Sequence, residues 1–346
     1  MAYITKFGTL HGAEIKATGR FFFVAPSSPY TVDGRSYDAS DSNDGESPER
    51  ALATVDRAVT LAGISRGGAA ISNAKDTIVL LPGTHTATGI IRLDTAGLTL
   101  TGLPNTVSFD GALPISTDTV LTTSASEHLI SVEASNVTIG NLTLRPLTAF
   151  IAVVFGNNPT VNNFRTKNVV VDLHTPAAST ATGGIDFGYR AASASASHNQ
   201  PLTKGNAAAA VIATAYMENV TILARDGQGR GIEQATASLT LKNVWFKHTG
   251  GGTWATPYHV ATNSVNSFAE DLKFTTSGTL TTNINGAAAS QANALTIHRT
   301  LFSATTTASS PMCYVTAGVI VAIDCHQPGR LHTLGFPIEA QPVATI

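Results

Sequence analysis

Two carboxylates occupy matching positions in two similar segments of the sequence. Asp186 stands in "GGIDFG" and Glu233 in "RGIEQA", each directly after an isoleucine. Hydrolysis of a glycosidic bond normally requires two carboxyl groups about 5–9.5 Å apart. The pair would lie about 5 Å apart on neighbouring strands, or about 10 Å apart if one strand separates them. The interpretation that we favour is simpler: both carboxylates are solvated on an outer face, opposite buried Ile185 and Ile232.

The other acidic residues and the histidines follow no catalytic or metal-binding pattern. Glu270 and Asp271 are adjacent, so on a strand their side chains point to opposite faces. The segment "DSNDG" at 41–45 resembles a calcium loop, but its glycine comes one residue early and no glutamate follows at the required distance, so we interpret it as a turn. We expect His85 and His298 at the surface or in turns. The sequence therefore predicts no metal, no cofactor and no enzymatic activity.

Two groups of aromatic residues are candidate binding residues. Trp254 and Tyr258 lie in "GGGTWATPYH", where exposed rings could stack on a sugar or meet a partner, or else cover the side of the fold. Phe21, Phe22 and Phe23 are consecutive in "RFFFVAP", and three consecutive side chains on a strand cannot all face one interior. At least one of these phenylalanines is therefore expected to meet another chain or the surface to which the protein attaches.

These residues are positioned by an internal repeat. The segment "LTLKNVWF" at 239–246 is repeated with variation, and its central polar residue marks each copy at Asn141, Asn168, Asn219, Asn243, Asp271, Arg299 and Asp324. The intervals are 27, 51, 24, 28, 28 and 25 residues, so the 51 is either two coils or one coil with an insertion. Apolar residues alternate on each side of the marker and change phase there, which is typical of two strands joined by a tight bend.

A stack of such coils is a β-solenoid. One coil cannot bury its apolar side alone, whereas stacking at about 4.8 Å buries a continuous column and lets equivalent asparagines form an amide ladder. A second apolar element precedes the marker by eleven residues at Ile130, Ile232 and Val260. We expect eight or nine coils, which would make a column about 40 Å long. The sequons at 136–138, 141–143 and 219–221 are interpreted as ladder positions.

Composition limits the partners. Only 13% of residues are charged and the net charge is −2, which gives no electrostatic basis for binding nucleic acid or an anionic membrane. The N-terminus lacks the pattern of a secretory signal, and no apolar run is long enough to span a bilayer. Cys313 and Cys325 are the two cysteines, and their spacing leaves open whether they are bridged.

The end segments differ from the repeat. "SPERALATVDRAVTLAG" predicts a helix with Ser47 as N-cap, Pro48 at its first position and an end near Gly63, lying across a first coil that begins at 76–89. Residues 190–206 are of low complexity and predict a mobile loop. We therefore divide the chain into an N-terminal attachment segment at 1–46, the capping helix and β-solenoid at 47–325, and an extended tail at 326–346.

The order "DSNDGESPERALATVDRAV", "DTIVLLPGTH", "GLTLTG" and coils marked "NV.I" resembles pectate-lyase-like right-handed parallel β-helix proteins, particularly those of tailed bacteriophages. The resemblance implies an all-β, right-handed parallel β-helix with an N-terminal capping α-helix. It also implies a homotrimer in the virion, assembled in the host cytoplasm on the major capsid protein or other virion proteins. Phage tailspikes of this type bind or cleave host polysaccharide.

Three functions remain open on this basis. We favour a head decoration protein that reinforces the capsid or adheres to surfaces, because the sequence is poor in acidic clusters and has only about 40 residues before the capping helix. The alternative is a tailspike-type receptor-binding protein with depolymerase activity through Asp186 and Glu233. An exported polysaccharide lyase is the third possibility, and the missing export signal argues against it.

Overall fold

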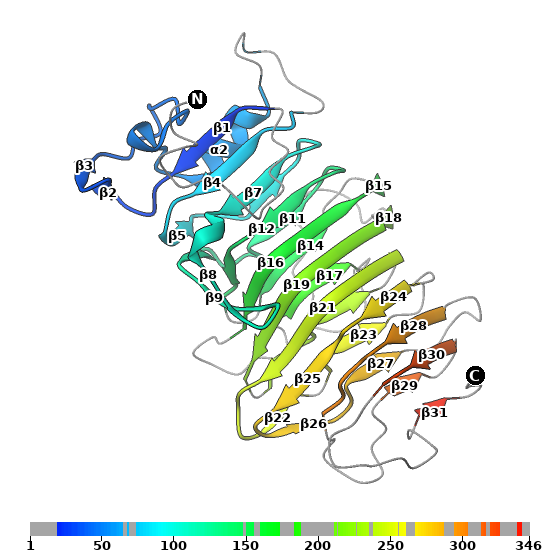
Figure 1. Ribbon diagram of the computed structural model, residues 1–346. Helices are drawn as coiled ribbons and strands as arrows, with labels where there is room; N and C mark the ends of the chain where they lie inside the picture. Colours follow the sequence, from blue (N-terminus) through cyan, green and yellow to red (C-terminus); the bar gives the residue numbers. More distant parts are fainter. Residues whose placement is uncertain are drawn as a thin grey trace.

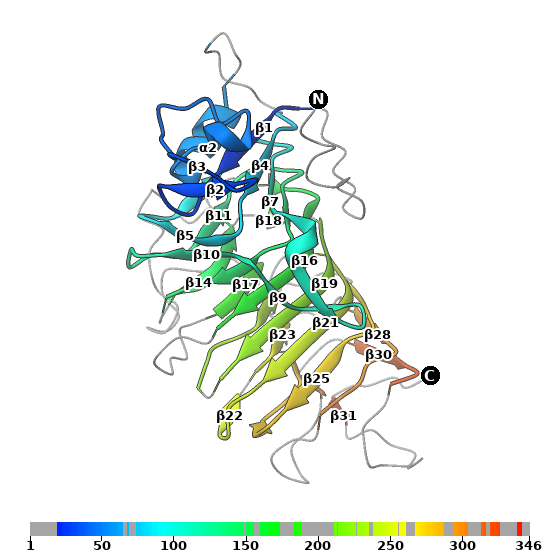
Figure 2. The ribbon, with the colours of Figure 1, turned by 60° about the vertical axis from the view of Figure 1, so that its left-hand side comes forward.

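The chain forms a parallel β-helix in which successive coils stack along one axis (Figures 1 and 2). The computed structural model describes residues 19–64, 68, 74–147, 150–155, 160–173, 183–187, 211–212, 214–225, 227–234, 238–254, 256–260, 267–286, 294–303, 313–315, 319–325 and 338–340. The loop predicted at 190–206 lies outside these residues. No helix in the described part is long and apolar enough to cross a membrane.

Two parallel sheets form the walls of the solenoid. Sheet 1 follows the path β1 (Phe21–Val24), β4 (Thr77–Leu80), β7 (Thr99–Gly102), β12 (Thr138–Gly140), β16 (Phe164–Asp172), β19 (Thr214–Ala224), β21 (Ser238–His248), β24 (Ser267–Glu270), β28 (Ala294–His298) and β30 (Val319–Ile323). Beside this path it contains β5 (Gly83–Ala87), β10 (Thr119–Thr123), β13 (Thr143–Arg145) and β25 (Lys273–Thr276). Sheet 2 contains β6 (Ile91–Leu93), β11 (Ile130–Val132), β14 (Ile151–Phe155), β17 (Gly183–Phe187), β20 (Ile232–Gln234), β23 (Tyr258–Val260), β27 (Ile284–Gly286), β29 (Cys313–Val315) and β31 (Ile338–Ala340).

Smaller strand pairs lie outside these walls. They are β2 (Tyr30–Val32) with β3 (Arg35–Tyr37), β8 (Val107–Asp110) with β9 (Leu113–Thr117), β15 (Thr160–Val161) with β18 (Val211–Ile212), and β22 (Thr253–Trp254) with β26 (Thr279–Leu280). The first two pairs are antiparallel hairpins, and the other two pair in parallel between coils.

The predicted corner is confirmed at every marker. All seven marker residues, from Asn141 to Asp324, have left-handed backbone with φ between 49° and 56°. On both sides of Asn243 the side chains alternate, so that Leu241, Val244 and Phe246 are all fully buried. A left-handed residue reverses the alternation, which lets the strands on both sides of the bend direct their apolar residues inward. The second apolar element is also confirmed, because Ile130 and Ile232 lie in sheet 2.

The 51-residue interval is one coil with an insertion. Strand β16 pairs directly with β19, with Val169 beside Val220 and no strand between them. In the described part of the chain the path of sheet 1 has ten strands and sheet 2 has nine, against the eight or nine coils expected. Strand β1 accounts for one of them, because it pairs in parallel with β4.

The N-terminal end is covered by the chain itself, in a way that differs from the prediction. Ser47 makes no side-chain cap and precedes the short 3-10 helix η1 (Pro48–Arg50), whereas the helix α2 (Val55–Ala62) is capped by Thr54, whose hydroxyl accepts the Arg57 amide. Proline at the first position favoured a helix start at residue 48, but the backbone is extended again at Ala51, where the 3-10 helix ends. Leu52 then bridges to Val24 and covers the open edge of β1.

The predicted boundary at residue 47 is therefore wrong, since β1 at Phe21–Val24 is already a rung of the solenoid. At the other end, β31 adds a strand to sheet 2 from within the predicted tail, and the rest of 326–346 lies outside the described residues. Cys313 and Cys325 are free thiols, both buried, and burial raises the pKa of each.

Candidate functional site

Asp186 and Glu233 lie side by side on sheet 2. Strand β17 pairs with β20 so that Asp186 is directly beside Glu233, while Ile185 and Ile232 beside them face the core. Neighbouring rungs are about 4.8 Å apart, close to the carboxyl spacing of retaining glycosidases, about 5–5.5 Å. The one-rung alternative is thus the correct one.

The pair is less exposed than we expected. Asp186 is only 4% exposed, and the Glu233 side chain is 16% exposed, so the prediction of two solvated carboxylates is wrong. Glu233 makes an ion pair with Arg230 three residues earlier. Its Oε1 also lies 3.8 Å from Nδ1 of His259, which is in register with Glu233 on β23. The row therefore combines two carboxylates, a guanidinium and an imidazole.

Sequence reasoning missed Arg230 and His259 as neighbours of Glu233. His259 follows Glu233 by 26 residues, which is one coil, so the repeat itself contained the signal. Chemically, the cluster could orient a polar ligand through Arg230 and transfer a proton through His259 or a carboxylate. In the described part of the chain no group of three His, Cys, Asp or Glu residues is arranged to hold a metal ion.

Trp254 and Tyr258 are core residues, so their prediction as exposed binding residues is wrong. Both are fully buried. The Trp254 indole donates to the Gly229 carbonyl at 2.7 Å, and the Tyr258 hydroxyl donates to Oε1 of Gln234 at 2.5 Å. Burial raises the pKa of Tyr258 well above its usual range. The indole N–H and the phenol hydroxyl each have a partner on the preceding coil, so both rings can be completely buried.

The three phenylalanines divide between two layers. Phe22 is buried in the main core, whereas Phe21 and Phe23 are half-buried on the outer side of β1, against a small cluster that includes Tyr30 and Val32. Tyr30 and Val32 belong to the β2–β3 hairpin. The argument that one of the three must meet another chain therefore no longer holds, because the chain's own hairpin packs there.

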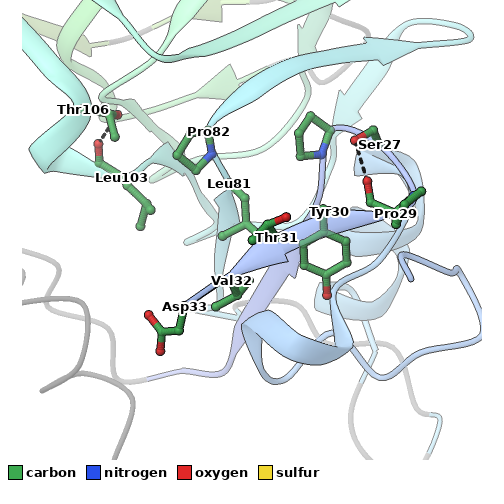
Figure 3. Close-up of a pocket in the computed structure, with 11 residues that line it drawn as sticks. Ser27, Pro29, Tyr30, Thr31, Val32, Asp33, Leu81, Pro82, Leu103 and Thr106 are labelled. Atoms are coloured by element: carbon green, nitrogen blue, oxygen red, sulfur yellow. Dashed lines mark hydrogen bonds between the residues drawn. The ribbon is translucent and has the colours of Figure 1, made fainter. Parts of the chain in front are cut away.

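A cavity of about 540 Å³ lies beside this hairpin (Figure 3). It is lined by Pro26, Ser27, Pro29, Tyr30, Thr31, Val32, Asp33, Leu81, Pro82, Leu103 and Thr106. Two of its hydroxyls are already engaged, since Ser27 donates to the Pro29 carbonyl at 3.2 Å and Thr106 to the Leu103 carbonyl at 2.6 Å. Asp33 is the only acidic or basic side chain among the residues that line it. The cavity therefore lacks the paired groups that acid–base catalysis requires.

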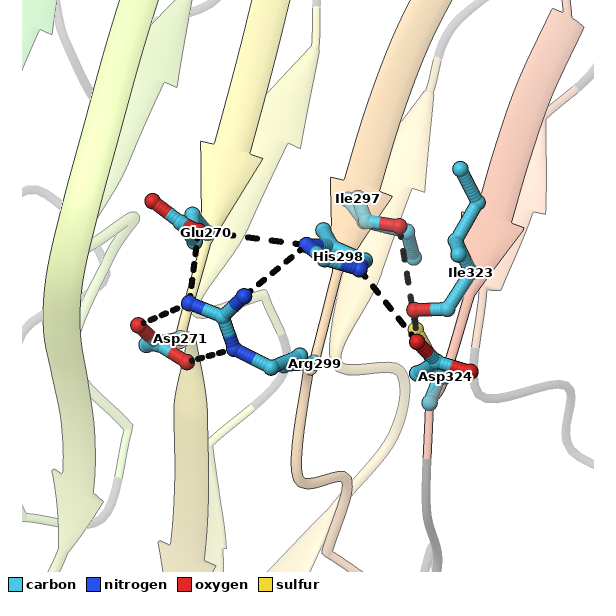
Figure 4. A network of polar contacts seen from close by, with 8 residues as sticks. Glu270, Asp271, Ile297, His298, Arg299, Ile323 and Asp324 are labelled. Carbon is cyan, nitrogen blue, oxygen red and sulfur yellow. Dashed lines mark hydrogen bonds and ion pairs between the residues drawn. The ribbon is translucent and has the colours of Figure 1, made fainter.

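The second acidic pair belongs to a charged network at the C-terminal end (Figure 4). Asp271 occupies the corner, as expected, and accepts two hydrogen bonds from Arg299 at 2.8 Å each. Glu270 accepts from the same guanidinium at 2.5 Å, and His298 lies 3.4 Å from Asp324. These contacts join neighbouring rungs, and we assign them to the wall of the solenoid.

His85 is placed differently from our expectation. It is 3% exposed, and its Nε2 lies 2.7 Å from the Leu81 carbonyl. Burial lowers the pKa of this imidazole below its usual value. The "DSNDG" segment is a turn as interpreted, and its Asp41 accepts the amides of Ala53 and Thr54 ahead of the helix.

No protein-family model matches the sequence, and no curated protein matches it. Solved structures of pectin methylesterase from Aspergillus niger are similar in fold. One, a penultimately deglycosylated form, has a TM-score of 0.54 and 13% identity over 95% of this chain and 90% of that chain. The deglycosylated form gives 0.51 and 14% over the same shares. At such identity the likeness shows the fold alone, and that fold is a right-handed parallel β-helix.

Proposed function

We propose that this chain is a rigid, non-catalytic β-helical protein that serves as a structural or adhesive part of a larger assembly. The observation that carries the proposal is the pairing of its acidic candidates with arginine. Glu233 contacts Arg230, and both Glu270 and Asp271 contact Arg299. A guanidinium that holds a carboxylate fixes its geometry. Such pairs stabilise a wall, and most of the acidic candidates are engaged in one.

The assembly that we propose is the virion of a tailed phage. The support is the sequence resemblance of the helix, first coil and corner motifs to phage β-helix proteins, together with the scarcity of acidic clusters. Within a virion, a head decoration protein that binds the major capsid protein fits a small rigid chain of this kind. The resemblance also favours a homotrimer.

Labelling of particles tests this assignment. An antibody against the purified chain should label intact particles of the virus that encodes it in negative-stain electron microscopy, on heads rather than tails. A variant that lacks residues 1–18 should fold and no longer join particles, because the attachment is expected to be N-terminal. The deletion stops before Arg20, whose guanidinium binds Asp76 at 2.7 Å and supports the helix end. Particles without the chain would overturn the assignment.

A polysaccharide-cleaving site at Asp186 and Glu233 is the second candidate. The specific observation in its favour is the direct register of the two carboxylates, with His259 beside Glu233. The similar solved structures are pectin methylesterases, so pectin is one polysaccharide to test.

Two variants separate the candidates. The purified chain is incubated with pectin and with host surface polysaccharide, and released reducing ends and methanol are measured. Under the main proposal neither product forms. Activity that Asp186→Asn with Glu233→Gln abolishes, and that the matched change Glu270→Gln retains, would assign the chain as an enzyme. Thermal melting shows whether each variant is folded.

A further inference from the structure

The large apolar side chains that the described residues leave exposed gather on one side of the molecule. They are Phe109, Ile115, Phe268 and Ile323, with exposed fractions of 38–44%. Phe268 and Ile323 lie on the outer side of sheet 1, because their strand neighbours Ala269 and Ala322 pack against the core. Phe109 and Ile115 belong to the β8–β9 hairpin. The outer side of sheet 2 has no such residue in the described part of the chain.

The hairpin is fixed to the same outer side of sheet 1. Its strand β9 crosses β16, β19 and β21, as Figure 2 shows. The Asn243 amide donates to the Ala112 carbonyl at 3.1 Å at the hairpin's turn, and the Thr117 and Thr143 hydroxyls are 2.9 Å apart at its base. Leu113 of this hairpin is buried, while Phe109 and Ile115 are 44% and 38% exposed. The hairpin is therefore a firmly held ridge with an apolar outer edge.

A row of alternating charges runs beside this ridge. On four successive rungs the outward residues in register are Lys167, Glu218, Lys242 and Glu270. Lys167 and Glu218 are 3.6 Å apart, and Glu270 is also bound by Arg299. The row is neutral in sum, which suits neither an anionic polymer nor an anionic membrane.

The order of the charges has a symmetry consequence. Read from one end the row is plus, minus, plus, minus, and read from the other end it is minus, plus, minus, plus. Two copies related by a two-fold axis perpendicular to the solenoid place Lys167 against Glu270 and Glu218 against Lys242. Every charge then faces its opposite, whereas two parallel copies in register would place like charges together. An isologous contact of this kind is the commonest in homo-oligomers.

We propose that this face, defined by Phe109, Ile115, Phe268, Ile323 and the row of four charges, docks antiparallel on the same face of a second copy of the chain. The apolar ridge supplies contact area, and the charges set the direction. The proposal rests on the proposed function only in requiring a role in an assembly. A parallel homotrimer is a different assembly from this antiparallel dimer, and the charge reversals below distinguish the two.

Charge reversal tests the proposed contact. The dissociation constant of the wild-type chain is measured by sedimentation velocity, with thermal melting as the check on folding. Lys242→Glu alone and Glu218→Lys alone each bring like charges together, and each should weaken self-association about tenfold or more. When one chain of each variant pairs antiparallel with the other, opposite charges face each other at all four positions. A mixture of the two variants should therefore associate as a heterodimer. Phe109→Asp should weaken association as well, whereas Arg35→Glu, an exposed change on the β2–β3 hairpin, should not.

Two results would overturn the proposal. The first is a wild-type chain that stays monomeric at micromolar concentration, and the second is a trimer that is insensitive to the charge reversals. If the chain is monomeric and its Phe109→Asp variant loses attachment to particles, the face is assigned to a different virion protein. Loss of labelled particles with an intact dimer would overturn the proposed function alone.

Discussion

The corner that runs along the solenoid is built with two different chemistries. Its first four markers, Asn141, Asn168, Asn219 and Asn243, form an amide ladder, whereas the last three, Asp271, Arg299 and Asp324, are ionic. The backbone conformation is the same throughout. The comparison therefore separates what the bend requires of the backbone from what the surroundings require of the side chain.

The amide corner is directional and neutral. The side-chain amides of Asn168, Asn219 and Asn243 each donate to the preceding asparagine, at 3.0, 3.0 and 2.8 Å. Asn141 ends the ladder by donating to the Thr101 hydroxyl at 3.0 Å. Asparagine tolerates left-handed backbone and offers both a donor and an acceptor, so one residue type meets both requirements on every rung. The ladder can therefore remain half-buried beside the β8–β9 hairpin.

The ionic corner is more exposed. The side chains of Asp271, Arg299 and Asp324 are 38%, 48% and 71% exposed. Arginine rarely adopts left-handed backbone, and here its guanidinium is held by two carboxylates of the preceding rung. Charged side chains can occupy this corner because they remain in contact with water. The difference shows that, where the bend is exposed to water, the left-handed backbone is compatible with several types of polar residue.

The largest expected effect concerns the core and should be the same in both regions. Leu241 lies under the amide corner and Ile297 occupies the matching inward position under the ionic corner, both fully buried. Leu241→Ala and Ile297→Ala should each lower the free energy of unfolding by about 2–5 kcal/mol, because each leaves a cavity. Urea denaturation measures both. A cost for Ile297→Ala under half that of Leu241→Ala would show that the terminal rungs unfold separately.

A smaller loss is expected at the amide corner itself. Asn219→Ala removes one donor and one acceptor from the middle of the ladder. It also places alanine in left-handed backbone, where its side chain cannot form the local hydrogen bonds by which asparagine tolerates this conformation. We expect a loss of about 2–4 kcal/mol in the free energy of unfolding. Asn219→Gly keeps the backbone unstrained and should recover about 1 kcal/mol of this loss. Equal costs for the two variants would mean that the ladder bonds contribute everything and the backbone nothing.

The repeat made the corner predictable, while features without a period were not. Every left-handed marker could be located from sequence, because a phase change at a polar residue has one simple structural cause. Burial of Trp254 and Tyr258 could not, since glycines beside them suggested a loop and their partners, Gly229 and Gln234, lie one coil away. Contacts between coils are distant in sequence, and only the correct register reveals them.

The site and the capping end show the same limit. The register of Asp186 with Glu233 followed from the repeat once the interval had been decided, but the contacts of Glu233 with Arg230 and His259 needed the structure. At the capping end, the sequence analysis expected Ser47 as the N-cap, whereas the helix is capped by Thr54. The choice depends on Asp41, whose carboxylate holds the Ala53 and Thr54 amides and thereby fixes where the helix starts.

The amide ladder does not titrate, whereas the buried imidazole of His85 gives another part of the solenoid a dependence on pH. Burial lowers the pKa of His85 below the usual 6.5, so between these two values the unfolded chain binds more protons than the folded one. The contribution of His85 to the free energy of unfolding is therefore complete above pH 6.5 and decreases as the pH falls below 6.5. His85→Gln keeps an N–H for the Leu81 carbonyl but does not titrate. The variant should lose less stability than the wild type between pH 6.5 and 5, measured by urea denaturation.

The smallest expected effect is that of the ionic corner on its own rungs. Exposed ion pairs contribute little to global stability and weaken as salt rises. Arg299→Gln should therefore leave the global free energy of unfolding nearly unchanged, while amide hydrogen exchange becomes faster in β28 and β30. At 1 M salt the wild type should exchange as fast as the variant in these strands. Exchange in β19 and β21, beside the amide ladder, should respond to neither the substitution nor the salt. A salt response of equal size in all four strands would show that the two corners stabilise the solenoid in the same way, and the distinction between them would then lose its energetic meaning.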